Sequence, residues 1–151
     1  MHPMMKPQGS KSKPQATPLE VITANMLCLY MKAKLFHLNA VGEGFYGAHK
    51  TFDGIADVGV DWFDTLAERM RALQLPVCVC PSWANELSLL EEDVNYDSEI
   101  DEMFEAMTSD LEVISNYINA HVNSYDGTTG NMLQELDAEL GKQAYFTRSS
   151  C

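Results

Sequence analysis

Two histidines and three carboxylates, all of them side chains suited to binding a metal ion, lie within one stretch of 32 residues. They are His37, His49, Asp53, Asp64 and Glu68. From Phe45 to about residue 73 the chain has no proline and places apolar residues at helical spacing, which predicts one long helix. At ~100° per residue, the last four of these ligand-type side chains share one face of that helix. Imidazole and carboxylate together suit iron, manganese or zinc better than copper(I).

One copy of this helix cannot bring all four side chains to a single ion. At a rise of ~1.5 Å per residue, His49 and Glu68 lie about 28 Å apart, and Asp53 and Asp64 about 16 Å apart. Metal–ligand bonds are only ~2.0–2.6 Å long. His49 and Glu68 lie equally far on either side of residues 58–59, and so do Asp53 and Asp64. A second, antiparallel copy of the helix would therefore set His49 and Asp53 opposite Asp64 and Glu68 of its partner across a two-fold axis. The sequence therefore predicts two identical metal sites, each shared between two subunits.

Glycines accompany both the predicted turn and the predicted contact between subunits. His37 lies five residues before the Gly-Glu-Gly segment 42–44, and His49 lies five residues after it. A turn at this segment would set the two histidines level on antiparallel helices. Gly54 and Gly59 would let the two long helices of a dimer approach closely.

The segments that carry these residues resemble the signature of the Dps family, the mini-ferritins named as DNA-binding proteins from starved cells. The matching segments read FHLNAVGEGFYGAHKTFDG and WFDTLAERMRALQLP, and the resemblance covers about residues 19–150. Carried over residue by residue, it implies iron ligands from two subunits. One subunit supplies His37, His49 and Asp53, and its neighbour supplies Asp64 and Glu68. The chain departs from the family at Leu38, where most members carry an aromatic residue.

The resemblance also implies the fold and the activity. The expected fold is an all-α, ferritin-like antiparallel four-helix bundle with a short extra helix in the crossover, assembled from two-fold dimers into a hollow dodecamer. Members of the family oxidise iron(II), usually with hydrogen peroxide and less readily with dioxygen, and store the iron(III) mineral in the shell, which protects DNA. The comparison places Asp126, Asn131 and Glu135 near three-fold channels. Asp126 and Glu135 are expected to help iron(II) enter.

Helical periodicity supplies the elements that would position these side chains, and no segment shows clear strand alternation. The residues Thr17-Pro18-Leu19-Glu20 predict a capped start for the first helix, which runs to about His37. The later helices are expected at about 45–73, from about Ser82 for a short helix, at about 98–123 and at about 129–149. Four long helices joined by one long crossover form a ferritin-type bundle.

Composition indicates a single intracellular domain. The length of 151 residues suits one core, and no apolar run reaches the ~18 residues of a membrane span. The start of the chain lacks a secretory signal, so we expect a cytoplasmic protein. Cys28, Cys78, Cys80 and Cys151 do not form a disulfide framework and are expected as reduced thiols, with a metal or redox site at Cys78-Val79-Cys80 as the alternative. His121 lies outside the ligand set and is expected to be structural or exposed.

Charge divides the chain into an arm and a body. Residues 1–16 contain three lysines and no acid, and they predict a disordered basic arm ahead of the bundle domain at 17–151, which carries 7 basic and 22 acidic residues. An acidic body repels phosphates, so DNA contact is expected to be weak and to involve the arm lysines, Lys6, Lys11 and Lys13. The protein would be nucleoid-associated only if this contact forms, and an unstructured leader is the alternative reading of the arm.

Two other functional hypotheses remain open at this point. The first is a nucleoid-packing DNA-binding protein whose metal site is vestigial. The second is a mononuclear non-haem iron oxygenase, because His37, His49 and Asp53 resemble a two-histidine, one-carboxylate triad. That second hypothesis gives Asp64 and Glu68 no role and identifies no pocket for an organic substrate.

Overall fold

The computed structural model describes residues 15–92 and 97–151, and this part of the chain contains helices and no strand. The elements are α1 (Pro18–Asn39), α2 (Phe45–Ala72), α3 (Pro81–Leu87), α4 (Ile100–His121), the short 3-10 helix η1 (Val122–Ser124) and α5 (Gly127–Arg148). The expected all-α bundle with a short helix in the crossover is confirmed. The expectations for the arm lysines Lys6, Lys11 and Lys13 lie outside the described residues.

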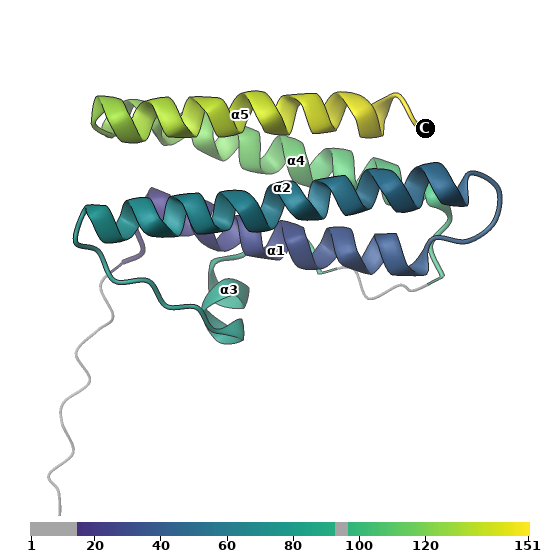
Figure 1. Ribbon diagram of the computed structural model, residues 1–151, viewed down its shortest axis with the longest axis horizontal. Helices are drawn as coiled ribbons and strands as arrows, with labels where there is room; N and C mark the ends of the chain where they lie inside the picture. The colour runs from purple at the N-terminus through teal and green to yellow at the C-terminus, as the bar shows by residue number, and fades with distance from the viewer. Residues whose placement is uncertain (1–14, 93–96) are drawn as a thin grey trace, which may run out of the picture.

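The four long helices form two antiparallel pairs, and these pairs pack against each other. Helices α1 and α2 lie side by side as one hairpin, while α4 and α5 form the other (Figure 1). The short helix α3 lies outside the bundle and packs against α1. Large side chains buried at the centre include Phe36, Phe52, Leu19, Ile22, Met26, Leu29, Ile55, Leu66, Met103, Met107 and Leu111.

Helix ends follow the capping signals in the sequence, with small shifts. Thr17 caps α1 as expected, accepting a hydrogen bond from the Glu20 amide at 3.2 Å. Glu99 caps α4 through a capping box with Glu102. Helix α5 begins at Gly127, two residues earlier than expected, because the Asp126 side chain accepts from the Thr129 amide and so serves as its N-cap.

Gly59 lies at the contact between α1 and α2, which corrects the expectation that it would serve a contact between subunits. It is buried, and a Cβ atom built there would lie 2.8 Å from the Met26 carbonyl oxygen and 2.9 Å from the Tyr30 amide nitrogen. Gly54 is exposed, and a Cβ atom there would have no atom within 4 Å. Of the two glycines, only Gly54 remains available to a partner helix.

Buried polar side chains attach the crossover to the bundle. The Asn25 Nδ2 atom donates to the Leu87 carbonyl at 2.9 Å, and the Asn25 Oδ1 atom accepts from the Leu89 amide at 2.8 Å. Lys32 forms a buried ion pair with Asp110 of α4 at 2.7 Å. Because these contacts join segments distant in sequence, they fix how the crossover lies on α1 and how α1 lies on α4.

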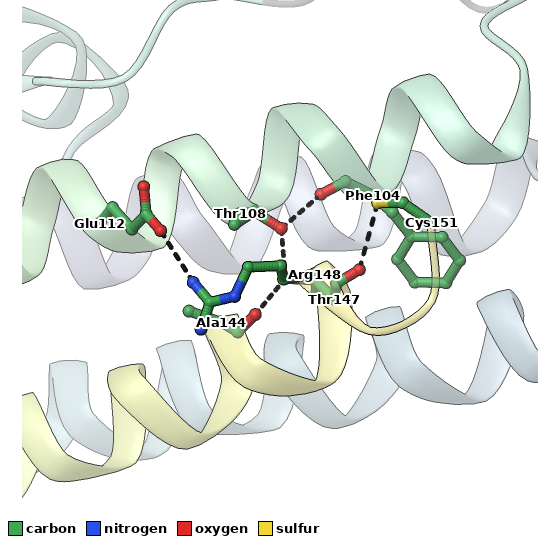
Figure 2. Close-up of polar contacts among 7 residues, drawn as sticks. All are labelled: Phe104, Thr108, Glu112, Ala144, Thr147, Arg148 and Cys151. Carbon is green, nitrogen blue, oxygen red and sulfur yellow. Dashed lines mark hydrogen bonds and ion pairs between the residues drawn. The ribbon is translucent and has the colours of Figure 1, made fainter.

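Hydroxyl groups join α4 and α5 near the end of the chain (Figure 2). The Thr108 and Thr147 Oγ1 atoms are 2.6 Å apart, and Thr108 also donates to the Phe104 carbonyl at 2.8 Å. One turn further along α4, Arg148 donates to Glu112 at 3.0 Å. These contacts hold the last turns of α5 on α4.

Within the described residues, no helix is long and apolar enough to cross a membrane.

Candidate metal centre

A glycine turn brings the two histidines together. Gly42 and Gly44 have φ angles of 93° and 80°, a left-handed conformation that L side chains rarely adopt. The turn joins the end of α1 to the start of α2 and reverses the chain. His37, in the last turn of α1, therefore lies beside His49, near the start of α2.

The two imidazole rings are stacked, and each ring contacts the backbone carbonyl of the other histidine. Their centroids are 3.8 Å apart with an interplanar angle of 18°. His37 Nδ1 lies 2.7 Å from the His49 carbonyl oxygen, and His49 Nδ1 lies 2.9 Å from the His37 carbonyl oxygen. A carbonyl oxygen only accepts hydrogen bonds, so this pairing assigns a proton to each Nδ1. In its neutral form, each ring then has its lone pair on Nε2, the arrangement found in metal-binding histidines.

Asp53 lies one turn after His49 and approaches the same pair of rings. Its Oδ1 atom is 3.9 Å from His37 Nε2. The same oxygen accepts a hydrogen bond from Lys34 Nζ at 2.6 Å. This hydrogen bond, aided by the lysine charge, holds the pKa of the Asp53 carboxyl below its ordinary value and raises the pKa of Lys34. The contact therefore keeps a carboxylate and an ammonium group beside the two rings.

Lys34 was missed by the sequence reasoning. It lies three residues before His37, so the two side chains share one face of α1. That spacing is a usable signal, but many lysines on helices lie near a ligand-type residue without contacting it. Only the rotation of α1 against α2 shows which carboxylate the ammonium group meets.

Asp64 and Glu68 lie further along α2, and both are exposed. Because α2 is one continuous helix from Phe45 to Ala72, Asp64 stays about 16 Å from Asp53 along its axis. Within residues 15–92 and 97–151, no group of three or more histidine, cysteine, aspartate or glutamate side chains is arranged to hold a metal ion. The structure therefore pairs His37 with His49 and places Asp53 3.9 Å from His37, while Asp64 and Glu68 lie apart, so the metal site expected from the sequence stays a prediction.

The position next to His37 carries no aromatic ring. Leu38 is exposed, while the Phe45 ring of α2 lies with its centroid 5.1 Å from that of His49. Phe45 therefore supplies an aromatic neighbour of His49 within this chain.

The two predicted channel residues differ in their surroundings. Asp126 caps α5, and its Oδ1 atom also accepts from Arg69 at 3.0 Å. Hydrogen bonds from the amide and hydroxyl of Thr129, followed by the charge of Arg69, hold the pKa of Asp126 below its ordinary value. Glu135 is exposed on α5. Asp126 therefore has a structural role that the sequence reasoning did not assign to it.

His121 lies at the end of α4, away from the histidine pair. Its Nδ1 atom is 2.8 Å from the Tyr117 carbonyl oxygen, and the two rings have centroids 4.2 Å apart. It is partly buried. These contacts agree with the expected structural role.

Comparison with known proteins connects this geometry to one family. The profile of the Ferritin-like domain matches residues 18–150. The DNA protection during starvation protein of Helicobacter pylori is 30% identical over 92 residues, which span 61% of this chain and 64% of that protein, a little under two thirds of its length.

Solved structures show the same fold. An archaeal Dps homologue from Halobacterium salinarum is 25% identical and has a TM-score of 0.82, covering 88% of this chain and 76% of that one. Dps from Microbacterium arborescens in a high iron form is 23% identical with a TM-score of 0.82, covering 88% and 89% of the two chains. The resemblance noted from the sequence is therefore confirmed.

Proposed function

Because the chain belongs to the ferritin-like family and has the fold of the Dps proteins, we propose that it is a ferroxidase that stores iron. In this proposal, iron(II) is oxidised at sites shared between two subunits. His37, His49 and Asp53 of one subunit act together with Asp64 and Glu68 of its neighbour. The iron(III) formed there is stored as a mineral inside a hollow dodecamer, which protects DNA from oxidative damage.

The observation that carries this proposal is the reciprocal pairing of the two histidines. Each ring is fixed by a hydrogen bond from Nδ1 to the backbone of the other residue. Both Nε2 atoms are consequently available as ligands without any rearrangement of the backbone. A pair of histidines serving only to pack the end of a hairpin would not need both rings fixed in the same tautomer.

The carboxylate ligands favour the oxidation of iron(II) to iron(III). Carboxylate oxygens are hard donors, and they stabilise iron(III) more than iron(II), so binding favours loss of an electron. Hydrogen peroxide, the oxidant that we propose, accepts two electrons and two protons to give two waters. Two iron(II) ions supply these electrons, one each. Asp64 and Glu68 of the neighbour would complete the ligand set that His37, His49 and Asp53 begin.

The acidic composition fits a shell that attracts cations. The bundle domain carries 22 acidic and 7 basic residues, and such a surplus raises the local concentration of iron(II). We propose Glu135, exposed on α5, as an entry residue. Asp126 is proposed beside it with a smaller contribution, because its carboxylate is already paired with Arg69.

Complementation between inactive subunits tests the shared site. His49→Ala and Glu68→Ala subunits, each inactive when alone, should regain iron oxidation when co-assembled. In a mixed dimer both changes fall in one site, and the other site is intact. The measurement is the rise of iron(III) absorbance after peroxide is added to the iron(II)-loaded protein.

A matched pair of variants provides the control. His49→Ala and Asp53→Ala change the same half of the site, so every site in their mixed dimers carries a lesion and activity should not return. If the first pair recovers no more activity than its parents, or if the second pair recovers as much as the first, the site is not shared in this way.

A further inference from the structure

Two cysteines lie together in the crossover, away from the histidine pair. Cys78 and Cys80 belong to the segment that joins α2 to α3, and their Sγ atoms are 3.4 Å apart. The Sγ atom of Cys80 also lies 3.4 Å from the Ser82 hydroxyl oxygen. Cys78 is exposed, and Cys80 is partly buried. The proposed iron chemistry uses neither thiol.

The distance of 3.4 Å between the two Sγ atoms places both thiols on one side of the chain. Cys80 has φ −143° and ψ 155°, an extended conformation. In an extended chain, side chains two residues apart point in the same direction. A disulfide needs its two sulfur atoms at about 2.05 Å, so the present separation must shorten by about 1.4 Å. Residues 75–79 belong to no helix or strand, so small rotations in this segment can bring the sulfur atoms together.

We propose that Cys78 and Cys80 are a peroxide-responsive dithiol that closes reversibly to a disulfide. The Cys78 thiolate attacks one oxygen of hydrogen peroxide, so that an S–O bond forms and the O–O bond breaks. The departing hydroxide takes up a proton and leaves as water. Cys80 then attacks the sulfur of the resulting sulfenic acid, the S–S bond forms, and the hydroxyl group leaves as a second water. Two thiols lose two electrons and two protons in total, and one peroxide is reduced to two waters.

Exposure decides the order of attack. A redox-active thiol must be reached by the oxidant, and Cys78 is the more exposed of the two. Cys80 lies closer to α3, where the Ser82 hydroxyl can donate a hydrogen bond to its sulfur. We therefore assign the first attack to Cys78 and the resolving attack to Cys80.

The other two cysteines lack these features. The Cys28 thiol donates to the Ala84 carbonyl at 3.4 Å, and burial raises its pKa, which lowers the fraction present as thiolate. Cys151, at the end of the described chain, donates to the Thr147 carbonyl at 3.4 Å (Figure 2). Each of these thiols donates to a backbone carbonyl, whereas the sulfur atoms of Cys78 and Cys80 lie beside each other.

The test uses the full chain, freed of iron with a chelator, so that its outcome does not depend on the ferroxidase proposal. One equivalent of hydrogen peroxide should lower the intact mass by about 2 Da, the two hydrogens lost on disulfide formation. Peptide mapping should place the bridge between Cys78 and Cys80, and dithiothreitol should restore the mass. Cys28→Ser is the matched control and should behave like the wild-type protein.

Single substitutions separate the two roles. In Cys80→Ser the mass loss should disappear, and dimedone, which traps sulfenic acids, should label Cys78. In Cys78→Ser the mass loss should also disappear. Gain of oxygen without loss of hydrogen in the wild-type protein would overturn the proposal. A bridge to Cys28 or Cys151, or an unchanged mass loss in Cys78→Ser, would do the same.

Discussion

Lys34 holds Asp53 through an ion pair of 2.6 Å and places a positive charge beside the two histidine rings. The Asp53 Oδ1 atom that accepts from the ammonium group is also the atom that lies 3.9 Å from His37 Nε2. A metal ion bound through this oxygen would compete with the lysine for it. In the proposed site, Lys34 therefore opposes metal binding through Asp53.

Replacing the lysine should strengthen metal binding at Asp53. In Lys34→Met, cobalt(II) or zinc(II) should bind up to about fivefold more tightly, the factor expected from the upper range of partly exposed ion pairs. Isothermal titration calorimetry on iron-free protein measures this affinity. Lys50→Met is the control, because Lys50 lies over the Tyr46 ring and not at Asp53. Weaker binding in Lys34→Met, with the control unchanged, would show that Lys34 supports the site and does not compete.

At the level of the helices, two contacts fix how α1 lies against its neighbours. Gly59 allows the backbones of α1 and α2 to touch, and the buried pair of Lys32 and Asp110 joins α1 to α4. The first contact matters for the metal centre because it lets α1 and α2 approach closely in the hairpin that carries His37 and His49. The second sets the position of the hairpin on the other half of the bundle.

A methyl group at Gly59 should destabilise the protein. The new Cβ atom would come within 3 Å of two backbone atoms of α1, so the helices must separate, at a cost of about 1–3 kcal/mol in the free energy of unfolding. Gly141→Ala is the matched control on α5, where a Cβ atom has no atom within 4 Å. It should stabilise by about 0.5–1 kcal/mol. Denaturant titration at fixed protein concentration measures both values. Equal effects of the two substitutions would show that the close approach of α1 and α2 does not require a glycine at position 59.

Removing the ammonium group of Lys32 should also be costly. Its side chain and that of Asp110 are 10% and 8% exposed, so Lys32→Met leaves a buried carboxylate without its ammonium partner. Loss of one member of a buried pair costs about 3–5 kcal/mol. Adding Asp110→Asn, which removes the second charge, should recover much of this loss in the same denaturant measurement. A double variant no more stable than Lys32→Met would show that packing, and not charge, accounts for the effect.

At the scale of the whole molecule, large apolar side chains remain exposed on all four long helices, and α2 and α5 carry several of them. Phe45, Tyr46 and Val60 of α2 and Tyr145 and Phe146 of α5 are each more than a third exposed. Such surface in one subunit is suited to burial between subunits. It supports the proposed assembly, in which α2 of one copy lies against α2 of the next.

The basic arm should give weak binding to DNA that is independent of sequence. Its lysines Lys6, Lys11 and Lys13 lie outside the described residues, so the prediction rests on charge alone. Many copies of the arm on one particle would add weak phosphate contacts, which salt screens. Gel-shift measurements should therefore show binding at low salt that disappears near physiological salt. A chain beginning at Thr17 should not bind, and retention of binding by this shorter chain would place the contact on the acidic body.

Much of this protein could be predicted from local pattern. The helices, the cap at Thr17 and the face of α2 that carries the histidine and carboxylates follow from a periodicity of 3.6 residues and from hydrogen bonds that span three or four residues. The spacing of Asp53 and Asp64 also excluded a site within one subunit, because helix length is fixed by geometry. These features depend on residues close together in sequence.

Only the tertiary structure decided which distant groups meet. The reciprocal bonds of His37 and His49, the pairing of Lys34 with Asp53 and the close contact at Gly59 depend on the rotation of α1 against α2. That rotation is set by packing across the whole hairpin, which no single segment encodes. The sequence therefore determined which residues could bind a metal, and the packing of the helices decided which of them are aligned and which charge competes for them.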